Sequence, residues 1–474
     1  DDDSIIQVLG INDFHGRLEA GSQGEAGAAV IAGAVKAKEA ANPNTLFVSA
    51  GDNIGASTFT SLIQDDSPTI DTLKASGLDV SAVGNHEFDR GFADLTDRVL
   101  PEYGGGEFGL GANVYKKGTK EPALQEYAVK DVDGVRVAFI GTVTPDTATM
   151  VDPAGIADLD FGDQLEAANR VADEITAGDL ADVIVLLTHS GAATSNDCAA
   201  LAADQAGFGA LAVNASPEID AIVSAHTHQT YACDLPVAGT DRTRPVIQAS
   251  EYGKAMGQLS LNWDSRTDSL ASVSGTTFPL AGAFPADADI AAKVAGYVAQ
   301  ADVIGAKPVG EISGDILRGG TPSGADRGVE SSMGNWVADV YLWATSQNPA
   351  YAGTKAQIAL MNPGGLRADL LKGDDGVVTY KEAALVQPFA NTLVTVTLTG
   401  EQIRGILNEQ WKAEGDRPKL HLGVSDGFTY TYEQDPANPR VGSVVSMAYQ
   451  GRAIADTDTF TVVTNSFLAN GGDG

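Results

Sequence analysis

The chain has 474 residues, of which 43% are hydrophobic and 20% are charged, a composition typical of globular proteins long enough for two or three domains. Its 63 acidic and 30 basic residues give a formal net charge of −33, which would repel a polyanion and argues against nucleic acid polymers as partners. A small phosphate ester remains compatible with this charge, because bound divalent cations invert the local field of an acidic site.

The first half of the chain alternates short strand-like runs with longer helical patterns. This alternation, from Ser4 to about Val143, indicates an α/β layer architecture. A second set follows, with a strand over residues 135–143, an amphipathic helix over 163–177 and further strands starting at Val183 and Ile219. From residue 246 to 285 a Thr- and Ser-rich alternation predicts antiparallel strands that close this domain.

A helix is predicted over residues 287–300, where apolar residues recur at Ile290, Val294 and Val298 behind a Pro-Ala-Asp start. We expect it to connect two domains. The predicted division is a first domain over residues 1–285, a linker helix over 286–305 and a second domain over 306–474. In the second domain, strands are expected at 357–361, 392–399 and 459–464, and helices at 332–346 and 401–411.

Cys198 and Cys233 are the two cysteines of the chain, and both lie in sequence that looks like loop. Neither belongs to a metal-binding C-x-x-C pair, so we expect a disulfide, with two free thiols as the alternative. There is no run of 18 apolar residues, and the chain starts at Asp1-Asp2-Asp3 without a basic-then-apolar leader. These features fit either a cytosolic protein or a processed secreted one.

Metal-ligating side chains follow five of the strand-like runs. They are Asp13 with His15, Asp52, the run Gly84-Asn85-His86-Glu87-Phe88-Asp89, His189, and His226 with His228. Each alone could be a helix cap, a turn former or a solvated group, but five of the six histidines fall in this set. Ligands at the ends of several strands converge on one rim of a sheet, and a two-metal site needs such ligands with one carboxylate bridging ions about 3.5–4 Å apart.

Three polar motifs occur in the second domain. Asn362 and Arg367 flank a Pro-Gly-Gly turn after an apolar strand, where glycine permits close ligand approach and arginine suits bidentate phosphate binding. Residues 387–391 and 465–473 each place a phenylalanine beside polar loop residues. These phenylalanines could stack on a base or could pack in the core, and Arg367 could lie on a solvated turn.

These motifs resemble those of the calcineurin-like metallophosphoesterases, and the Asn-His-Glu-Phe-Asp form resembles the 5′-nucleotidase branch. The motifs of the second domain are similar to the 5′-nucleotidase C-terminal domain. The resemblance implies an α/β fold with a four-layered α/β/β/α metallophosphoesterase domain, followed by a smaller α+β substrate-binding domain. It also implies two divalent ions, one held by Asp13, His15, Asp52 and His228, and the other by Asp52, Asn85, His189 and His226.

The resemblance assigns roles to the remaining residues as well. His86 and Asp89 match a catalytic dyad at the reacting phosphate. The positions that match substrate contacts are Phe389 and Phe467 for the base, Asp473 for the ribose, and Asn362, Arg367 and Arg327 for phosphate. Asn391, a polar residue beside Phe389, is a further candidate for substrate binding. A basic residue that neighbours Arg327 in some relatives is replaced around Ser323 to Ala325.

The expected function is hydrolysis of nucleoside 5′-monophosphates to nucleoside and phosphate by a metal-activated water, between two domains that move during turnover. The metals could be Zn, Mn, Co or Fe. Alternative enzymatic functions are those of a UDP-sugar hydrolase or a 2′,3′-cyclic nucleotide phosphodiesterase and 3′-nucleotidase. The non-enzymatic alternative is a surface adhesion or nucleotide-binding protein. Because the family is mostly periplasmic, cell-surface or secreted, we expect such a location here.

Overall fold

The computed structural model describes residues 3–151, 153–388, 391–414, 417–469 and 471–474. The chain forms two compact units, Asp1–Ala301 and Asp302–Gly474. The helix α10 (Ala288–Gly305) contains the point where one unit ends and the other begins. None of the described helices combines the length and the apolar character needed to cross a membrane.

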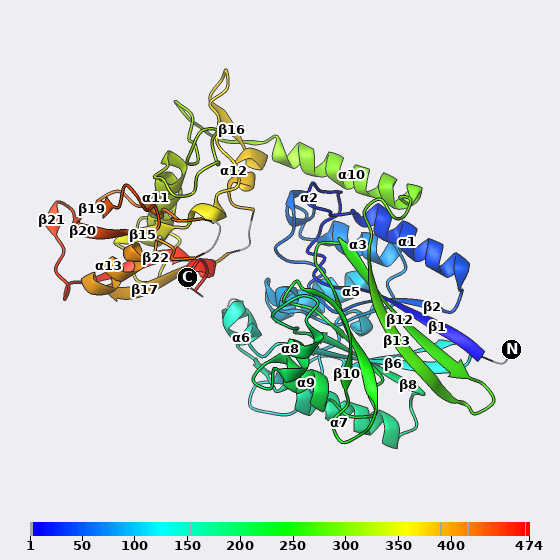
Figure 1. Ribbon diagram of the computed structural model, residues 1–474. Coiled ribbons are helices and arrows are strands. Elements are labelled where there is room, and N and C mark those ends of the chain that lie inside the picture. Colours follow the sequence, from blue (N-terminus) through cyan, green and yellow to red (C-terminus); the bar gives the residue numbers. More distant parts are fainter. Residues whose placement is uncertain (1–2, 152, 389–390, 415–416, 470) are drawn as a thin grey trace. The chain divides into compact units, whose positions relative to one another are not determined.

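Two sheets form the centre of the N-terminal unit (Figure 1). The first has the strand order β13 (Ser269–Pro279), β12 (Ala255–Asp264), β1 (Asp3–Ile11), β2 (Thr45–Ser49) and β3 (Val80–Ser81). The second has the order β10 (Thr230–Pro236), β11 (Thr243–Ala249), β9 (Ala221–Ser224), β8 (Val183–His189), β6 (Val135–Val143) and β5 (Tyr127–Val132). Strands β1, β2 and β3 are parallel, as are β6, β8, β9 and β11.

Alternating side chains on these strands build two faces of core. On β1, Ile6 and Val8 pack between the two sheets, whereas Leu9 and Ile11 pack against α1 (Ala28–Ala41) and α3 (Ser67–Ala75). On β8 the fully apolar run 183–187 is buried on both faces, which is typical of a parallel strand covered by helices.

The outer face of the second sheet packs against α7 (Gln164–Ala177), α8 (Cys198–Ala203) and α9 (Phe208–Asn214). Helix α7 begins where the Asp163 carboxylate accepts a hydrogen bond from the Glu166 amide, and it buries Ala167, Val171 and Ile175 at a spacing of four residues. Figure 1 shows α1 and α3 on one side of the unit and α7 to α9 on the other. The predicted α/β/β/α layering is confirmed.

Shorter elements complete the unit. They are β4 (Val114–Lys116) paired with β7 (Leu159–Phe161), and the helices α2 (Phe59–Leu62), α4 (Phe92–Asp94), α5 (Leu100–Tyr103) and α6 (Thr147–Met150).

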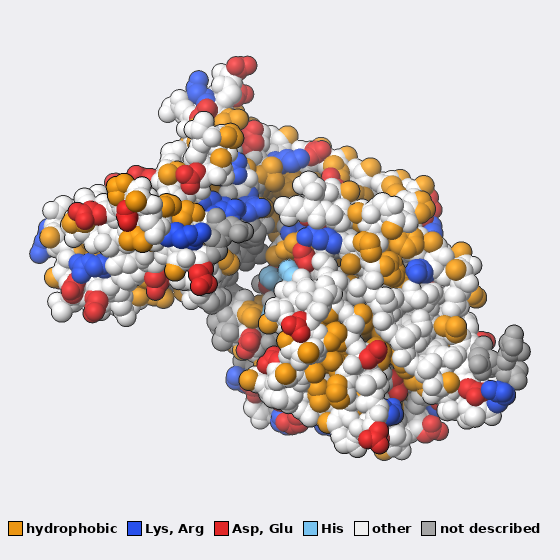
Figure 2. Space-filling view, viewed as in Figure 1, with side chains coloured by type: hydrophobic (Ala, Val, Ile, Leu, Met, Phe, Trp, Pro, Cys, Tyr) orange, Lys and Arg blue, Asp and Glu red, His pale blue; other side chains and the backbone are white. Residues whose placement is uncertain are grey.

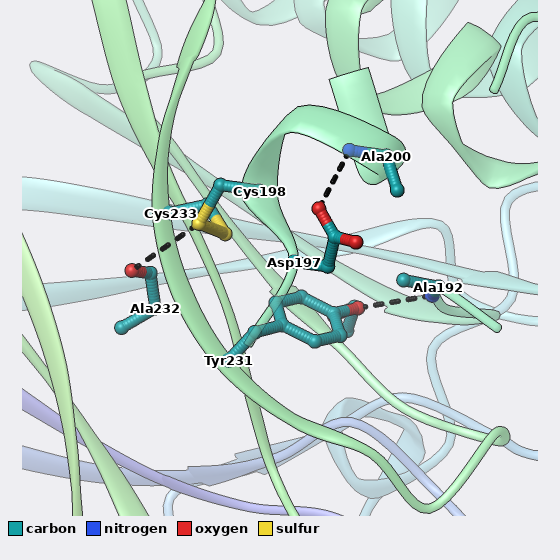
Figure 3. Close-up of a disulfide and its surroundings, with 8 residues drawn as sticks. Ala192, Asp197, Cys198, Ala200, Tyr231, Ala232 and Cys233 are labelled. Carbon is teal, nitrogen blue, oxygen red and sulfur yellow. Dashed lines mark hydrogen bonds between the residues drawn. A yellow bond between two sulfur atoms is a disulfide. The ribbon is translucent and has the colours of Figure 1, made fainter. Parts of the chain in front are cut away.

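Cys198 and Cys233 form the expected disulfide (Figure 3). Their predicted placement in loops is wrong, because Cys198 begins α8 and Cys233 lies in β10. On β10 the alternating residues Tyr231, Cys233 and Leu235 point inward, but Asp234 and a terminal proline interrupt the apolar signal of this edge strand. The bond joins the segment that follows β8 to the strand that follows β9.

The C-terminal unit is a smaller α+β structure. Its central sheet has the order β17 (Leu393–Thr399), β22 (Thr459–Asn465), β15 (Ile358–Met361) and β18 (Gly423–Val424). Helix α11 (Ser332–Ser346) packs on one face, and α13 (Gly400–Asn408) packs on the other with β19 (Phe428–Gln434) and β20 (Gly442–Tyr449). The remaining elements are β14 (Pro308–Glu311), β16 (Val377–Thr379), α12 (Tyr380–Val386), β21 (Arg452–Ala453) and α14 (Ser466–Ala469).

Candidate metal centre

The predicted ligands of the N-terminal unit lie directly after parallel strands. Asp13 and His15 follow β1, Asp52 follows β2, Asn85 follows β3, His189 ends β8, and His226 and His228 follow β9. Five of these residues have left-handed backbone conformations, with φ of 50° for Asp13, 48° for His15, 55° for Asp52, 74° for His226 and 58° for His228. Strands β1, β2 and β9 therefore end in sharp turns that direct these side chains across the rim of the sheet.

The structure brings these side chains together. Asp52 Oδ2 lies 3.6 Å from Nε2 of His15 and 2.9 Å from Nε2 of His189. Asp13 Oδ1 lies 3.3 Å from Nε2 of His228. Three groups have ligand atoms within 4.8 Å of one another, and they are Asp13/His15/His228, His15/Asp52/His86 and Asp52/His189/His226. The first and third groups contain residues of the two expected ligand sets, and Asp52 lies within reach of both.

Buried polar atoms without hydrogen-bond partners point to a cation at this place. Within the described residues, Asp13 Oδ1, Asn85 Oδ1 and His189 Nε2 are buried and make no hydrogen bond. His189 Nε2 is close to a carboxylate oxygen of Asp52, yet without the geometry of a hydrogen bond. Burying an acceptor oxygen or nitrogen without a hydrogen-bond donor is costly, and a divalent ion that binds these atoms removes the cost. The residues present therefore fit two divalent ions.

Backbone carbonyls set the tautomers of two histidines. Nδ1 of His15 donates to the Gly55 carbonyl at 2.7 Å, and Nδ1 of His189 donates to the Ala50 carbonyl at 2.9 Å. A carbonyl can only accept, so the proton is on Nδ1 and the lone pair of Nε2 is left for a ligand. Burial lowers the pKa of His15 to about 4, which keeps this imidazole neutral as a metal ligand must be.

His189 is under the opposite influence. Burial lowers its pKa, but the carboxylates of Asp52 and Asp13 outweigh burial and raise the pKa to about 10. The two carboxylates thus stabilise one positive charge beside Nε2. A divalent ion would supply that charge in place of a proton.

Glu87 connects two of the ligand loops, a role that its sequence position did not reveal. Its carboxylate accepts hydrogen bonds from the amides of Asp52 at 2.9 Å, Asn53 at 3.0 Å and Gly84 at 2.9 Å. Burial, with the nearby charge of Asp52, raises the pKa of Glu87 to about 8. Glu87 therefore holds the backbone that presents Asp52.

His86 and Asp89 form a hydrogen-bonded pair on the short turn after β3, with 2.8 Å between Nδ1 and Oδ2. Burial lowers the pKa of His86, but Asp52 and then Asp89 outweigh it and raise the pKa to about 9. The His86 ring packs edge-on against His15, with 5.0 Å between centroids. The side chain is 29% exposed, and pale-blue histidine atoms reach the molecular surface in Figure 2. This pair can present a charged donor to a ligand at the rim.

The C-terminal unit brings three of its sequence motifs together. The side-chain oxygen of Asn362 accepts from Asn465 at 2.8 Å, and its amide donates to Asp473 at 3.4 Å. Asn391 accepts from Ser466 at 3.1 Å, and Phe467 is 44% exposed. Phe389 lies outside the described residues, so its expected pairing with Phe467 stays a prediction.

Arg327 and Arg367 line one cavity of the C-terminal unit, with a volume of about 170 Å³. Arg318 also lines it, a residue that the sequence did not single out. Arg318 belongs to none of the motifs recognised in the sequence and lies nine residues before Arg327. Only the fold of the intervening turn brings it to the same wall.

Parallel strands that end in aspartate, asparagine and histidine bring together a set of candidate metal ligands at this rim. Residues 6–230 match the family described as Calcineurin-like phosphoesterase, and residues 308–474 match 5′-nucleotidase, C-terminal domain. The chain belongs to the 5′-nucleotidase family, which joins these two domains.

Similar proteins span nearly the whole chain. Endonuclease YhcR of Bacillus subtilis is 32% identical over 98% of this chain and 37% of its own length. Cell wall protein Lmo0130 of Listeria monocytogenes is 30% identical over 99% of this chain and 64% of its own length. The chain thus covers less than two thirds of either relative. The crystal structure of a 5′-nucleotidase precursor from Thermus thermophilus has 27% identity and a TM-score of 0.63, covering 99% of this chain and 91% of that one.

Proposed function

We propose that this chain hydrolyses nucleoside 5′-monophosphates to nucleoside and phosphate, with two divalent ions and with residues of both units. The observation that carries the proposal is the set of buried, unpartnered ligand atoms on Asp13, Asn85 and His189. A module that only bound nucleotides through its C-terminal unit would have no use for these atoms.

One ion would be held by Asp13, His15, Asp52 and His228, and the other by Asp52, Asn85, His189 and His226. When bound, the ions supply positive charge for the phosphoryl oxygens and lower the pKa of water. Oxygen and imidazole donors admit Zn, Mn, Co or Fe, and the choice among them depends on geometry and supply.

His86 would act on the phosphoryl group directly. Its Nδ1 is engaged by Asp89, so Nε2 is free to donate to a phosphoryl oxygen or to the leaving ester oxygen. The raised pKa of His86 supports a charged donor at neutral pH, although a cation bound by Asp52 would offset part of this rise.

Residues of the C-terminal unit would bind the rest of the nucleotide. Arg327, Arg367 and Asn362 are proposed to contact phosphate, because a guanidinium presents two parallel donors to phosphate oxygens. Phe467 and Phe389 are proposed to stack on the base, and Asn391 and Asp473 to contact the ribose. The exposed ring of Phe467 and the hydrogen bond between Asn362 and Asp473 support this grouping.

A UDP-sugar or a 2′,3′-cyclic nucleotide remains an alternative substrate, since the same ions and dyad could serve either ester. A polynucleotide is disfavoured by the net charge of −33, even though one relative is named an endonuclease. We also propose an extracellular or cell-surface location, supported by the Cys198–Cys233 disulfide and by the relative named a cell wall protein.

Phosphate release assays test the proposal. The purified chain is loaded with Mn²⁺, Co²⁺ or Zn²⁺ and incubated with AMP, UDP-glucose, 2′,3′-cyclic AMP, a single-stranded oligonucleotide and glycerol phosphate. We expect fastest release from AMP and loss of activity with a chelator. Chromatography of the products is needed as well, because UDP-glucose and the cyclic nucleotide first give monophosphates and no free phosphate. Faster turnover of either would select that alternative, and no product from any ester would contradict hydrolysis.

A further inference from the structure

The turn between β11 and β12 places one tyrosine against one set of candidate metal ligands. The Tyr252 amide donates to the Asp13 carbonyl at 2.8 Å. The Tyr252 ring packs edge-on against the rings of His15 and His228, with centroids 5.8 Å and 5.4 Å away, and these two imidazoles lie 5.6 Å from each other. Tyr252 therefore contacts all three residues of the Asp13/His15/His228 group.

The other set of expected ligands has a different support. Within the part of the chain that the structure describes, no hydrogen bond or ring contact joins Tyr252 to Asn85, His189 or His226. The His189 ring packs instead against His226, with 5.1 Å between centroids, and its Nδ1 donates to the Ala50 carbonyl at 2.9 Å. The two groups of ligands are thus held by separate parts of the fold.

His228 depends on packing more than the other ligand of its group. Its side chain is 34% exposed, and Nε2 lies 3.3 Å from Asp13 Oδ1. Among the described residues neither ring nitrogen of His228 donates to a backbone carbonyl, whereas Nδ1 of His15 donates to the Gly55 carbonyl. A side chain that must be ordered on binding loses rotamer freedom, and packing against a fixed ring lowers that cost. Tyr252 supplies such a ring.

Arg17 holds the Tyr252 ring in place. Its guanidinium carbon lies 3.8 Å from the ring centroid, a favourable position for a cation over an aromatic face. Nη1 of Arg17 donates to the carbonyls of His15 at 2.8 Å and Ala56 at 2.6 Å. The Tyr252 hydroxyl makes no hydrogen bond within the described residues, so the ring alone makes these contacts. Phenylalanine at this position would keep them.

The backbone of Tyr252 gives an independent reason to look for a role of its side chain. Its φ is +57°, in the left-handed region that bulky residues rarely enter. Glycine or asparagine would form this turn with less strain, so the turn alone does not account for a tyrosine. Strained residues persist where surrounding contacts hold them, and they gather at functional sites.

We propose that Tyr252 is a positioning residue for one of the two ions, the ion that Asp13, His15, Asp52 and His228 would hold. The inference rests on the proposed function for the presence of two ions and deepens it. The ring fixes the two imidazoles of this ion, and the tyrosine amide fixes the loop of Asp13. The second ion does not depend on Tyr252. Loss of the ring should therefore weaken one ion selectively.

Stepwise removal of metal tests the proposal without measuring activity. The parent chain and Tyr252→Asn are loaded with Co²⁺ and titrated with a chelator. Native mass spectrometry counts the bound ions, and visible absorption follows their coordination. We expect Tyr252→Asn to weaken one ion by about 10-fold or more and the other by less than about threefold, as is typical when a group that orients a ligand is lost. Asparagine suits the left-handed turn, so the variant removes the ring and keeps the turn.

Two further variants serve as controls. Tyr252→Phe keeps the ring and should hold both ions within about threefold of the parent. Tyr297→Asn removes a half-buried tyrosine of the same unit, whose hydroxyl donates to Asp71, and should leave both affinities unchanged. Equal weakening of both ions in Tyr252→Asn, no weakening of either, or an equal loss in Tyr252→Phe would overturn the proposal.

Double variants identify which ion is weakened. His228→Asn removes a ligand of the supported ion, and His226→Asn removes a ligand of the other. Adding Tyr252→Asn to His228→Asn should lower neither affinity by more than about threefold, because both changes act on the same ion. Added to His226→Asn, it should weaken the remaining ion by about 10-fold or more. The reverse pattern would overturn the assignment.

Arg17→Gln guards against misfolding of the asparagine variant, and circular dichroism of each variant verifies folding. If Tyr252→Asn does not fold, Arg17→Gln decides. Loss of the cation over the ring should weaken one ion by about threefold and leave the other unchanged, and equal values for both ions would overturn the proposal. A parent that holds two ions but releases no product from any ester would contradict the proposed function alone, since Tyr252 is judged on the two affinities.

Discussion

The metal-ligand loops of the N-terminal unit and the arginine-lined cavity of the C-terminal unit hold their charges in different ways. Among the loops, each charged ligand is fixed by backbone groups, as when Asp13 accepts from the His226 amide and Asp52 from the His86 amide, both at 2.9 Å. In the cavity, Arg327 and Arg367 have no such partner among the described residues. The charged ligands of the first site are thus held by the protein's own hydrogen bonds, whereas these two guanidinium groups are not. Substitutions should therefore change metal binding and kcat in one, and substrate choice in the other.

The largest effect is expected for Asp52→Ala. Asp52 is the carboxylate within reach of both expected ion positions, so its loss removes a ligand from each. We expect kcat to fall by more than about 10³-fold, because the ions supply several kcal/mol of charge stabilisation. Phosphate release and metal content by mass spectrometry check this. Activity within tenfold of the parent, with two ions still bound, would contradict the bridging assignment.

His86→Gln tests the dyad without removing a metal ligand. Loss of a general acid typically costs 10²–10⁴-fold, so we expect kcat to fall by about 10²-fold or more at saturating metal, with unchanged metal content. Asp89→Asn should have a smaller effect, since the imidazole remains. If His86→Gln kept kcat within about threefold of the parent, the proposed role of His86 would be wrong.

Glu87→Gln tests how far metal binding depends on the hydrogen bonds that hold the backbone of the ligand loops. Glutamine has one acceptor oxygen where the carboxylate has two. Its side-chain NH₂ group, which is a donor, would face backbone amides that now donate to the second oxygen. We expect metal affinity to fall by about 10–100-fold, as is typical for groups that orient ligands, with activity recovered by excess metal. Titration of the metal-free chain with Mn²⁺ measures the shift. An unchanged affinity would mean that the backbone holds Asp52 unaided.

His421→Leu tests a buried imidazole of the C-terminal unit, because Nδ1 of His421 is buried without a hydrogen-bond partner among the described residues. Burial and then Lys419 lower the pKa of this imidazole to about 4. A folded pKa below the unfolded value of about 6.5 means that the unfolded chain binds the proton first, so stability is lost as pH falls below about 6.5.

Between pH 7 and pH 5 the parent should therefore lose about 2 kcal/mol more of unfolding free energy than His421→Leu. Urea unfolding followed by tryptophan fluorescence checks this, since Trp336, Trp343 and Trp411 report on the C-terminal unit. For each protein, the unfolding free energy at pH 7 is subtracted from the value at pH 5. This difference cancels the effect of the substitution on packing, which does not depend on pH. Parallel pH curves for the two proteins would refute the assignment to His421.

The fold class could be predicted because buried parallel strands have a distinct pattern. The run 183–187 is apolar throughout, and His189 follows at once, so strand and site were visible together. Two edge strands of the second sheet were missed. Strand β5 contains Lys130 and Asp131, and β10 contains Asp234, because one face of an edge strand tolerates charge. A sequence motif therefore identifies a ligand only where the residues that mark it lie close together in the chain.

The support of both sites was harder to predict for a related reason. Glu87 is inside a recognised motif, but its three amide partners belong to two loops that only the fold brings together. Arg318 depends on a turn closed by Gly324 and on Asp369, which lies 51 residues away. The sequence shows no characteristic spacing for such residues, because their partners are close in space but far apart in the chain.

The left-handed backbone at five of the metal-ligating positions has a consequence for how this chain can change over evolutionary time. Asparagine, aspartate and histidine are the non-glycine residues that enter this conformation most readily, and they are also common metal ligands. The turns therefore favour ligating side chains even without an ion. If selection for catalysis were relaxed, β-branched and bulky residues would still be excluded at Asp13, His15, Asp52, His226 and His228. A descendant of this chain could thus regain a metal centre through few substitutions.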